Sequence, residues 1–359
     1  MTGENGSKCW SVVLLYTVML FAACTSDGAR SGAPAAASNS APSESVAGSA
    51  PAAGAATQPA AAAEPPVALK PLKIAVPNHA ASQLHVYATR DLGIYEQHGF
   101  DADIAFIPNA STGMAALQSG EIDLYTGATT AMNAALRGLP VRVVLVSANY
   151  ADFVLAAAKD LTDVEQLRGK VIAGYGPETF INSMTTELLR RKGLAPDQYE
   201  LLNVGGSRVP SLVSGVASAT LIDNSEALPL VREGYQVLAR ARDGIEIPIS
   251  GLAAAQASIR DRPEVLKPAM QATLDGMRTI VTQKDTVVPV IAAEFDRPVE
   301  DAAYVYDGLR DSFPLDGRPT PGGVEFAFAL SQQELGLTEP IRPEQVYDFS
   351  LLEEIQPRR

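Results

Sequence analysis

Residues 73–107 read KIAVPNHAASQLHVYATRDLGIYEQHGFDADIAFI. The stretch opens with a short apolar run that ends at Pro77, and a helical pattern over residues 84–97 follows, which Gly99 closes. A second apolar run covers residues 103–107. A strand, a helix and another strand in this order form the unit of a parallel sheet, because parallel neighbours need a long crossover connection. The stretch therefore predicts an α/β fold.

The same alternation of apolar runs and helical patterns continues along the chain in two groups. The first group adds, in order, a helix, a strand, a helix and a strand over residues 111–118, 122–125, 130–137 and 141–147. The second group begins at Val171 and alternates four strands with three helices over residues 171–173, 179–191, 201–204, 208–214, 219–222, 226–233 and 236–239. We expect two mainly parallel sheets, each flanked by helices.

Two further apolar stretches, residues 153–158 and 249–255, separate these groups from each other and from the helical remainder. We interpret them as two segments that cross between lobes. The predicted first lobe then takes residues 68–160 and 249–359, including C-terminal helices. The predicted second lobe takes residues 161–248.

The N-terminal residues have the pattern of a targeting signal. Lys8 precedes an apolar run over residues 9–24, which is shorter than the ~20 residues that a helix needs to span a bilayer. We predict a signal peptide over residues 1–23. The ending Leu20-Phe-Ala-Ala-Cys24 resembles a bacterial lipobox, and this resemblance implies that Cys24 is lipidated. Plain secretion and a short uncleaved anchor are the alternatives.

A linker follows Cys24. From residue 31 to residue 67 the chain is almost wholly Ala, Pro, Ser and Gly, and Glu44 and Glu64 are its only charges. Such a segment buries too little apolar surface to offset the entropy cost of ordering it. We predict that residues 24–67 form a disordered, lipid-anchored tether that holds a soluble domain beside a membrane.

Composition excludes several classes of function. The net charge is −13, and −11 without residues 1–67, so a phosphate backbone is a poor partner and no nucleic acid is expected. The only cysteines are Cys9 and Cys24, and the histidines are three and scattered. We therefore expect no structural metal site and no disulfide framework, and we predict no cofactor.

Four motifs resemble one family of proteins. They are Asp91-Leu-Gly-Ile-Tyr-Glu-Gln-His-Gly-Phe100, Leu117-Gln-Ser-Gly-Glu-Ile-Asp-Leu124, Asp163-Val-Glu-Gln-Leu-Arg-Gly-Lys-Val-Ile172 and Arg262-Pro-Glu-Val-Leu-Lys267. They are similar to the periplasmic solute-binding proteins of ABC importers, in the branch for nitrate, sulfonates, taurine and thiamine precursors (SsuA/THI5-like), in lipoprotein form. The resemblance covers nearly all of residues 72–285. It implies a two-lobed periplasmic-binding-protein fold of type II that closes on a small molecule, an ABC permease as partner, and a monomer.

The candidate ligand-binding residues lie in loops that follow predicted strands. In α/β sheets ligands bind beyond the carboxyl ends of strands, where loops and helix N-termini offer backbone N–H groups. The predicted site residues are Asn78, His79, Ser82, Asn109, Ser111, Thr112, Gly127, Thr129, Thr130, Tyr175, Gly176, Thr179, Gly206, Ser207, Arg208, Asp223 and Asn224. The alternative is that the Asn, Ser and Thr residues are ordinary helix N-caps.

The head group of the ligand stays open at this point. Arg208 could hold an anionic group in a bidentate fashion, or it could be a solvated helix residue. A neutral heterocycle would instead use Asn78, Asn109, Asp223 and Asn224. The neutral or weakly charged ligand is favoured, because these loops hold one arginine and no lysine and the acidic domain repels anions.

The function that we expect is an exported lipoprotein that faces the periplasm or the cell exterior and captures a small polar or aromatic metabolite for an ABC importer. Sulfonate, nitrate, a pyrimidine thiamine precursor and riboflavin are the ligand types that the resemblance implies. No catalysis is expected. The alternative is an enzyme or a ligand-sensing domain on the same fold.

Overall fold

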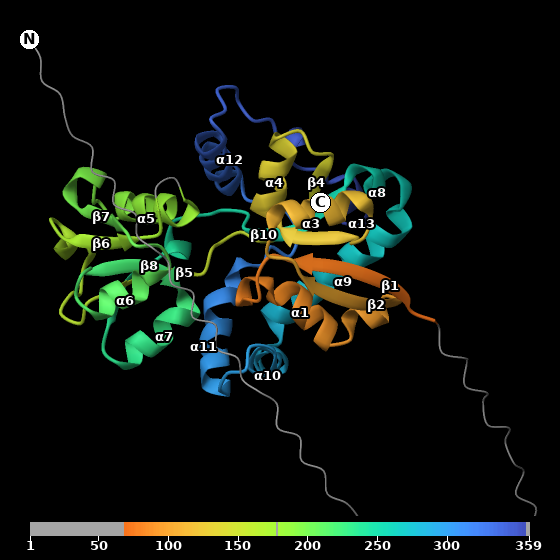
Figure 1. The fold of residues 1–359 in the computed structure, drawn as a ribbon. Coiled ribbons are helices and arrows are strands. Elements are labelled where there is room, and N and C mark those ends of the chain that lie inside the picture. Colours follow the sequence, from red (N-terminus) through yellow and green to blue (C-terminus); the bar gives the residue numbers. More distant parts are fainter. Residues whose placement is uncertain (1–67, 177–178, 357–359) are drawn as a thin grey trace, which may run out of the picture. The chain divides into compact units, whose positions relative to one another are not determined.

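Two five-stranded sheets organise the protein in its computed structural model. Figure 1 shows the two sheets with the helices around them. The structure describes residues 68–176 and 179–356, which belong to one compact unit. The predicted signal peptide, Cys24 and the linker lie outside the described residues. Each sheet is flanked by helices, so the predicted two-lobed α/β fold is confirmed.

The first sheet has the strand order β2-β1-β3-β10-β4. Strand β1 pairs in parallel with β2 and β3, whereas β10 runs antiparallel to both β3 and β4. The sheet is thus mainly parallel, with one reversed strand next to its edge. Its strands are β1 (Lys70–Val76), β2 (Phe100–Phe106), β3 (Leu124–Gly127), β4 (Val141–Ala148) and β10 (Ser250–Ala255).

The second sheet repeats this arrangement with the order β7-β6-β8-β5-β9. Here β6 pairs in parallel with β7 and β8, and β5 is the reversed strand between β8 and β9. The place of β5 in this sheet therefore corresponds to that of β10 in the first. The strands are β5 (Phe153–Ala157), β6 (Val171–Gly174), β7 (Glu200–Asn203), β8 (Ala219–Asp223) and β9 (Gln236–Arg240).

The position of β5 corrects the predicted lobe boundary. The sequence analysis assigned residues up to 160 to the first lobe and treated residues 153–158 as a crossing segment. In the structure β5 is hydrogen-bonded on both edges to strands of the second sheet, which starts the second lobe at Phe153. Apolar composition alone predicts a buried strand but not the sheet to which it belongs.

The two crossing segments are residues 149–152 and residues 241–249. They contact each other, since the Ile247 amide donates to the Asn149 carbonyl over 2.8 Å. The Asn149 amide in turn donates to the carbonyl of Ser312 over 2.9 Å. The lobes are therefore joined by two chain segments that lie side by side, and the segment that follows α11 is hydrogen-bonded to the first of them.

The first lobe has an apolar core on each face of its sheet. Leu72, Ile74 and Val76 of β1 are buried against α1 and α9, while Ala75 points to the opposite face, where α3 and α4 pack. This alternation follows from the two-residue repeat of a strand. The helices are α1 (Leu84–Asp91), α2 (Ile94–Gln97), α3 (Ala110–Ser119), α4 (Ala128–Leu136), α8 (Gln256–Asp261), α9 (Pro263–Thr282), α10 (Lys284–Glu294), α11 (Val299–Leu309), α12 (Pro321–Leu335) and α13 (Ser350–Ile355).

The single helix predicted over residues 84–97 is two helices in the structure. Gly93 separates them with a φ of 67°, a left-handed conformation that glycine adopts without steric cost. Tyr95 of the second piece is 1% exposed, and its hydroxyl lies 3.0 Å from Thr273 Oγ1 of α9. The break turns α2 so that this tyrosine reaches the core.

The second lobe packs helices on both faces of its sheet. Leu155 and Leu221 are buried on the face that holds α5, whereas Val154 and Ile222 face α6 and α7. The helices are α5 (Phe180–Arg191), α6 (Arg208–Val213) and α7 (Asn224–Arg232). The described chain also contains short 3-10 helices, η1 (Ala81–Gln83), η2 (Val164–Leu167), η3 (Pro196–Gln198), η4 (Gly205–Ser207), η5 (Ala241–Asp243), η6 (Arg310–Ser312) and η7 (Pro343–Gln345).

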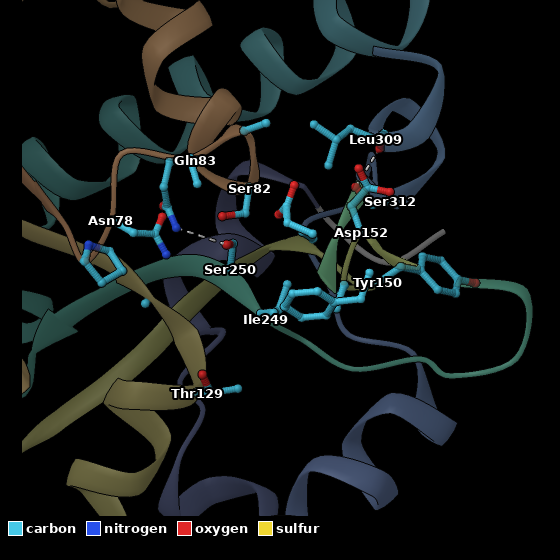
Figure 2. Close-up of a pocket in the computed structure, with 18 of the residues that line it drawn as sticks. Asn78, Ser82, Gln83, Thr129, Tyr150, Asp152, Ile249, Ser250, Leu309 and Ser312 are labelled. Carbon is cyan, nitrogen blue, oxygen red and sulfur yellow. Dashed lines mark hydrogen bonds between the residues drawn. The ribbon is translucent and has the colours of Figure 1, made fainter. Parts of the chain in front are cut away.

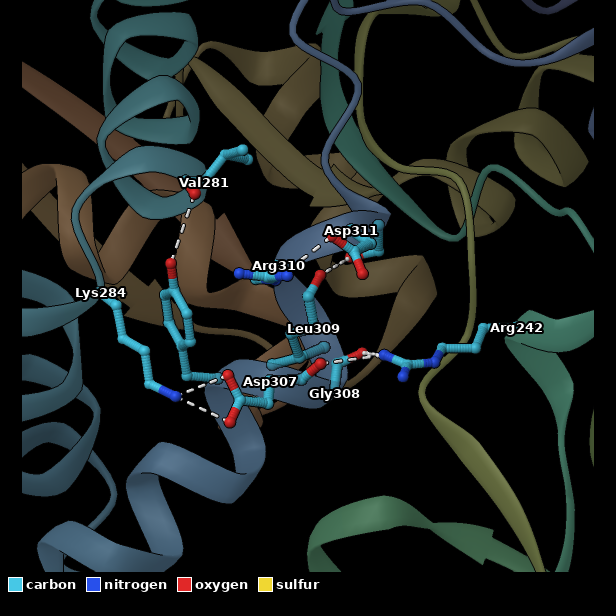
Figure 3. A network of polar contacts seen from close by, with 10 residues as sticks. Arg242, Val281, Lys284, Asp307, Gly308, Leu309, Arg310 and Asp311 are labelled. Atoms are coloured by element: carbon cyan, nitrogen blue, oxygen red, sulfur yellow. Dashed lines mark hydrogen bonds and ion pairs between the residues drawn. The ribbon is translucent and has the colours of Figure 1, made fainter.

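Helix α11 connects the lobes from the side. Val305 and Leu309 are buried in the core of the first lobe, and the same helix contacts α7 of the second. Arg242 of the second crossing segment donates to the carbonyls of Asp307 and Gly308 over 3.0 and 2.8 Å, as Figure 3 shows. Within residues 68–176 and 179–356, the helices are all too short or too polar to cross a membrane.

Candidate functional site

A cavity of about 350 Å³ lies where the two lobes meet. Its walls come from the carboxyl ends of β1, β3, β4 and β8, from both crossing segments, and from the segment after α11 (Figure 2). The lining residues are Pro77, Asn78, Ala80, Ala81, Ser82, Gln83, Gly127, Thr129, Thr130, Ala148, Tyr150, Ala151, Asp152, Phe153, Phe180, Asp223, Ile249, Ser250, Leu309, Ser312 and Phe313. Strand ends of both sheets thus converge on one site, as in other α/β folds.

Part of the predicted site lines this cavity. The strand-end loops of the first lobe contribute polar groups, and β8 of the second lobe contributes one carboxylate. These residues are Asn78, Ser82, Gly127, Thr129, Thr130 and Asp223.

His79 lies in the predicted loop but does not line the cavity. Its Nε2 is 2.9 Å from Glu294 Oε1 of α10, and its ring packs against Tyr87 and Phe295. The histidine therefore belongs to the packing of η1 and α1 on α10.

Asn109, Ser111 and Thr112 also lie away from the cavity between the lobes. Asn109 is the N-cap of α3, because its Oδ1 accepts a hydrogen bond from the Thr112 amide over 2.9 Å. Ser111 lines a different cavity, between α3 and α4. Asn109 thus fits the helix-cap alternative that the sequence left open, and Thr112 is the residue in the first turn of α3 that it caps.

The predicted site residues after β6 and β7 that the structure describes pack on one another and on β8 and do not line the cavity. Thr179 caps α5, and its hydroxyl donates to the Gly176 carbonyl over 2.8 Å. Arg208 donates to the Leu221 carbonyl, and its guanidinium lies 5.5 Å from the centre of the Tyr175 ring. Burial lowers the pKa of Arg208. Gly206 and Ser207 are exposed and do not line the cavity.

Asn224 lies directly behind the cavity wall. It is 1% exposed, and its Oδ1 accepts hydrogen bonds from Tyr304 over 2.8 Å and from Arg240 over 3.0 Å. Its backbone amide donates to the Asp152 carbonyl over 2.8 Å. Asn224 therefore holds the first crossing segment and α11 together.

Asp152 is a site residue that the sequence analysis missed. It lies in the first crossing segment and lines the cavity, as Figure 2 shows. Burial, and then the negative charge of Asp223, raise the pKa of Asp152 to about 7, against weaker opposing effects of Asn224, Arg242 and Arg240. Its carboxyl group therefore changes charge near neutral pH.

Gln83 and Ser250 were also missed. Gln83 ends η1 and is 2% exposed, and its Nε2 is 3.5 Å from Ser250 Oγ. Gln83 Oε1 has no hydrogen-bond partner within the described part of the chain. The cavity wall thus holds a buried acceptor that a ligand could satisfy.

Aromatic side chains complete the lining. Phe153 and Phe180 have ring centres 6.2 Å apart, and Tyr150 and Phe313 add further apolar surface. Tyr150 donates to Glu246 Oε1 over 3.1 Å. Phe180 ends a predicted ligand loop, whereas Tyr150 and Phe153 belong to or follow the first crossing segment, where a tyrosine could either stack on a flat ligand or pack between the lobes.

The cavity lining carries negative charge only. Its ionisable side chains, among the residues the structure describes, are Asp152, Asp223 and Tyr150, without lysine, arginine or histidine. In that same part of the chain, no cluster of His, Cys, Asp and Glu could hold a metal ion. The site therefore offers hydrogen-bond acceptors, carboxylates and aromatic surface.

Comparison with known proteins gives one family. The model of the NMT1/THI5-like family matches residues 77–286, which is more than half of the chain. None of the curated proteins matches the chain in sequence.

Solved structures share the fold at low sequence identity. A sulfonate-binding protein SsuA from Methylobacillus flagellatus superposes with a TM-score of 0.64 and 16% identity, over 80% of this chain and 94% of that one. The aliphatic sulphonate-binding protein SsuA of Escherichia coli superposes with a TM-score of 0.59 and 17% identity, over 77% of this chain and 92% of that one. The desulfurization enzyme DSZB superposes with a TM-score of 0.60 and 13% identity, over 79% of this chain and 98% of that one. At these identities the likeness establishes the fold.

Proposed function

Because the chain belongs to the NMT1/THI5-like family, we propose that it is the solute-binding component of an ABC importer and captures a small polar or aromatic metabolite between its lobes. One observation carries this proposal. The strand ends of both sheets and both crossing segments line a single cavity of about 350 Å³, a size suited to a small metabolite. A site shared in this way can report its occupancy through the relative position of the lobes.

Closure on the ligand is the mechanism that this arrangement supports. Two crossing segments, residues 149–152 and 241–249, join the lobes, and few backbone angles need to change for a hinge motion there. A ligand that contacts both walls stabilises the closed form by its differential affinity for the two forms. The closed form is what an ABC permease would recognise.

The proposed location follows from the N-terminal sequence. Export by the signal peptide and lipidation of Cys24 would tether the domain to the membrane, facing the periplasm or the cell exterior. Cys24→Ser should move the protein from the membrane fraction to the soluble exported fraction. Unchanged membrane association in this variant would contradict the anchor.

The enzyme alternative rests on the fold of DSZB, which is described as a desulfurization enzyme. Residues 68–359 contain no cysteine, and the described lining contains hydroxyl groups but no histidine to activate them. The chemistry of the lining therefore supports ligand binding more than catalysis.

The experiment is a thermal-shift screen of the protein without its signal peptide against sulfonates, nitrate, pyrimidines, riboflavin and aromatic acids and amines. A saturating ligand should raise the melting temperature and reduce the radius of gyration in small-angle scattering. A ligand that is turned over during the measurement would favour the enzyme. Absence of any ligand from the screen would count against solute binding.

A further inference from the structure

We propose that the cavity selects an organic cation, an amine or amidinium group on a flat apolar body, and that Asp152 and Asp223 hold the cationic group. This inference rests on the proposed function and narrows its ligand class. It goes beyond the sequence-based preference for a neutral or weakly charged ligand.

The strand register brings the two aspartates close together. Asp223 is the last residue of β8, and its antiparallel partner on β5 is Phe153, the neighbour of Asp152. The Asn224 amide, one residue after Asp223, donates to the Asp152 carbonyl over 2.8 Å. Both aspartates line the cavity, one from each side of this backbone connection.

Local hydrogen bonds hold Asp223 in place without using all of its carboxylate. Its Oδ1 accepts from the Ser225 amide over 2.9 Å and from the Ser225 hydroxyl over 2.7 Å, which caps α7. No hydrogen bond of Oδ2 is found within the described chain. That oxygen can therefore face a ligand from a fixed position.

The nearby arginines are engaged elsewhere and do not line the cavity. Arg208 donates to the Leu221 carbonyl, Arg240 to Asn224 Oδ1, and Arg242 to the carbonyl of Gly308 (Figure 3). The repulsion between Asp152 and Asp223 is thus only partly compensated, as the raised pKa of Asp152 also indicates. A bound cation would relieve this repulsion, whereas a bound anion would add to it.

An independent observation concerns Gln83, which contributes to the cavity wall from η1. Its side chain is 2% exposed, and Oε1 lacks a partner in the described residues. A buried acceptor without a donor is costly, so a ligand that brings N–H groups gains from this contact. Figure 2 shows Gln83 and Asp152 entering the site from different segments, which suits a ligand with more than one donor.

The aromatic residues fit the apolar body of such a ligand. Phe153, Phe180 and Phe313 line the same cavity as the two aspartates. Aromatic faces attract cations as well as flat rings. The described lining offers a sulfonate or nitrate neither an arginine nor a lysine. We therefore do not infer a sulfonate ligand from the fold that this protein shares with sulfonate-binding proteins.

Three isosteric probes test the charge preference directly. Benzamidine, benzamide and benzoate have nearly the same flat shape but carry a positive, a zero and a negative charge. With the protein lacking its signal peptide, calorimetry at pH 8 should give an affinity for benzamidine about tenfold or more above that for benzamide, and no measurable binding of benzoate.

Variants assign the preference to the carboxylates. Asp152→Asn should weaken the binding of benzamidine about tenfold or more and change the affinity for benzamide by less than about threefold. Asp223→Asn should act in the same direction and fold normally, because Asn is an equally good N-cap. Asp261→Asn removes the same charge from α8, away from the cavity, and should leave all three affinities unchanged.

Several outcomes would overturn the inference: benzoate binding as tightly as benzamidine, equal losses for benzamidine and benzamide in Asp152→Asn and Asp223→Asn, or no binding of any probe. Compaction by an anion such as nitrate or benzoate would reject the cation preference and leave the solute-binding function standing. Failure of the whole metabolite screen would instead reject that function.

Discussion

Gly308 of α11 lies against Asp152: a Cβ atom at Gly308 would be 3.0 Å from Asp152 Oδ2 and 2.5 Å from Asn224 Nδ2. Helix α11 belongs to the core of the first lobe, whereas Asn224 starts α7 of the second. The lobes therefore meet at this point through a position without a side chain. The closeness of this contact fixes where Asp152 stands at the cavity wall.

Gly308→Ala should weaken this junction. The methyl group would push against Asn224 and Asp152, and overpacking of this kind costs about 1–3 kcal/mol, although alanine is the better helix former. We expect a lower free energy of unfolding in urea and weaker benzamidine binding. Gly322→Ala in α12 is the control, because among the described residues a Cβ atom there would meet only the end of a flexible side chain, Glu246 Oε2 at 3.2 Å. A Gly308→Ala variant as stable as the control would contradict the tight junction.

The charge of Asp152 should make stability depend on pH. The folded-state pKa of about 7 lies above the ordinary value of 3.8, so the native state holds this proton more tightly than the unfolded state does. This contribution to stability is present at low pH and is lost as pH rises from about 4 to about 7. Near pH 4 the Asp152→Asn variant should have the same free energy of unfolding as the wild type.

At pH 8 and without ligand, Asp152→Asn should be more stable than the wild type by up to about 4 kcal/mol, since one pKa unit corresponds to about 1.4 kcal/mol. Urea unfolding at the two pH values measures the difference. Asp261→Asn controls for the loss of a surface charge and should show no such gain. A constant difference between Asp152→Asn and the wild type across this range would reject the raised pKa.

Tyr304 should control how firmly α11 holds the second lobe. Tyr304→Phe removes the hydroxyl that donates to Asn224 Oδ1 over 2.8 Å, a contact worth about 0.5–1.5 kcal/mol. We expect a larger radius of gyration for the ligand-free protein in small-angle scattering, because a contact between the lobes is lost. The Tyr306 hydroxyl donates to the Val281 carbonyl within the first lobe, so Tyr306→Phe should leave the radius of gyration unchanged. Equal effects of the two variants would show that Tyr304 acts on general stability only.

Arg208 should matter for stability rather than for ligand binding. Its guanidinium donates to the Leu221 carbonyl and does not line the cavity. Arg208→Ala should lower the free energy of unfolding by about 1–2 kcal/mol and change benzamidine affinity by less than about twofold. Arg260→Ala, an exposed arginine of α8, is the control for stability. A strong loss of benzamidine binding in Arg208→Ala would contradict this prediction and show that Arg208 takes part in ligand binding.

The local patterns of the sequence were sufficient for the elements and the family. Leu72, Ile74 and Val76 alternate with the period of a strand, and Asn109 caps α3 two residues before the predicted start of that helix. The resemblance of four motifs to solute-binding proteins is confirmed by the family match over residues 77–286. These features depend on neighbours along the chain, which is why the sequence alone determined them.

The composition of the candidate site was decided by tertiary structure. An Asn or Thr after a strand can cap a helix or face a ligand, and the residue type is the same in both cases, so Asn109 and Thr179 could not be told apart from Asn78 and Thr129. Asp152 and Gln83 reach the cavity because β5 pairs with β8 and because η1 packs beside β10. Such pairing joins residues far apart in the chain through backbone hydrogen bonds that no local pattern encodes, and Asp152 meets Asp223 only once β5 has paired with β8 in the second sheet.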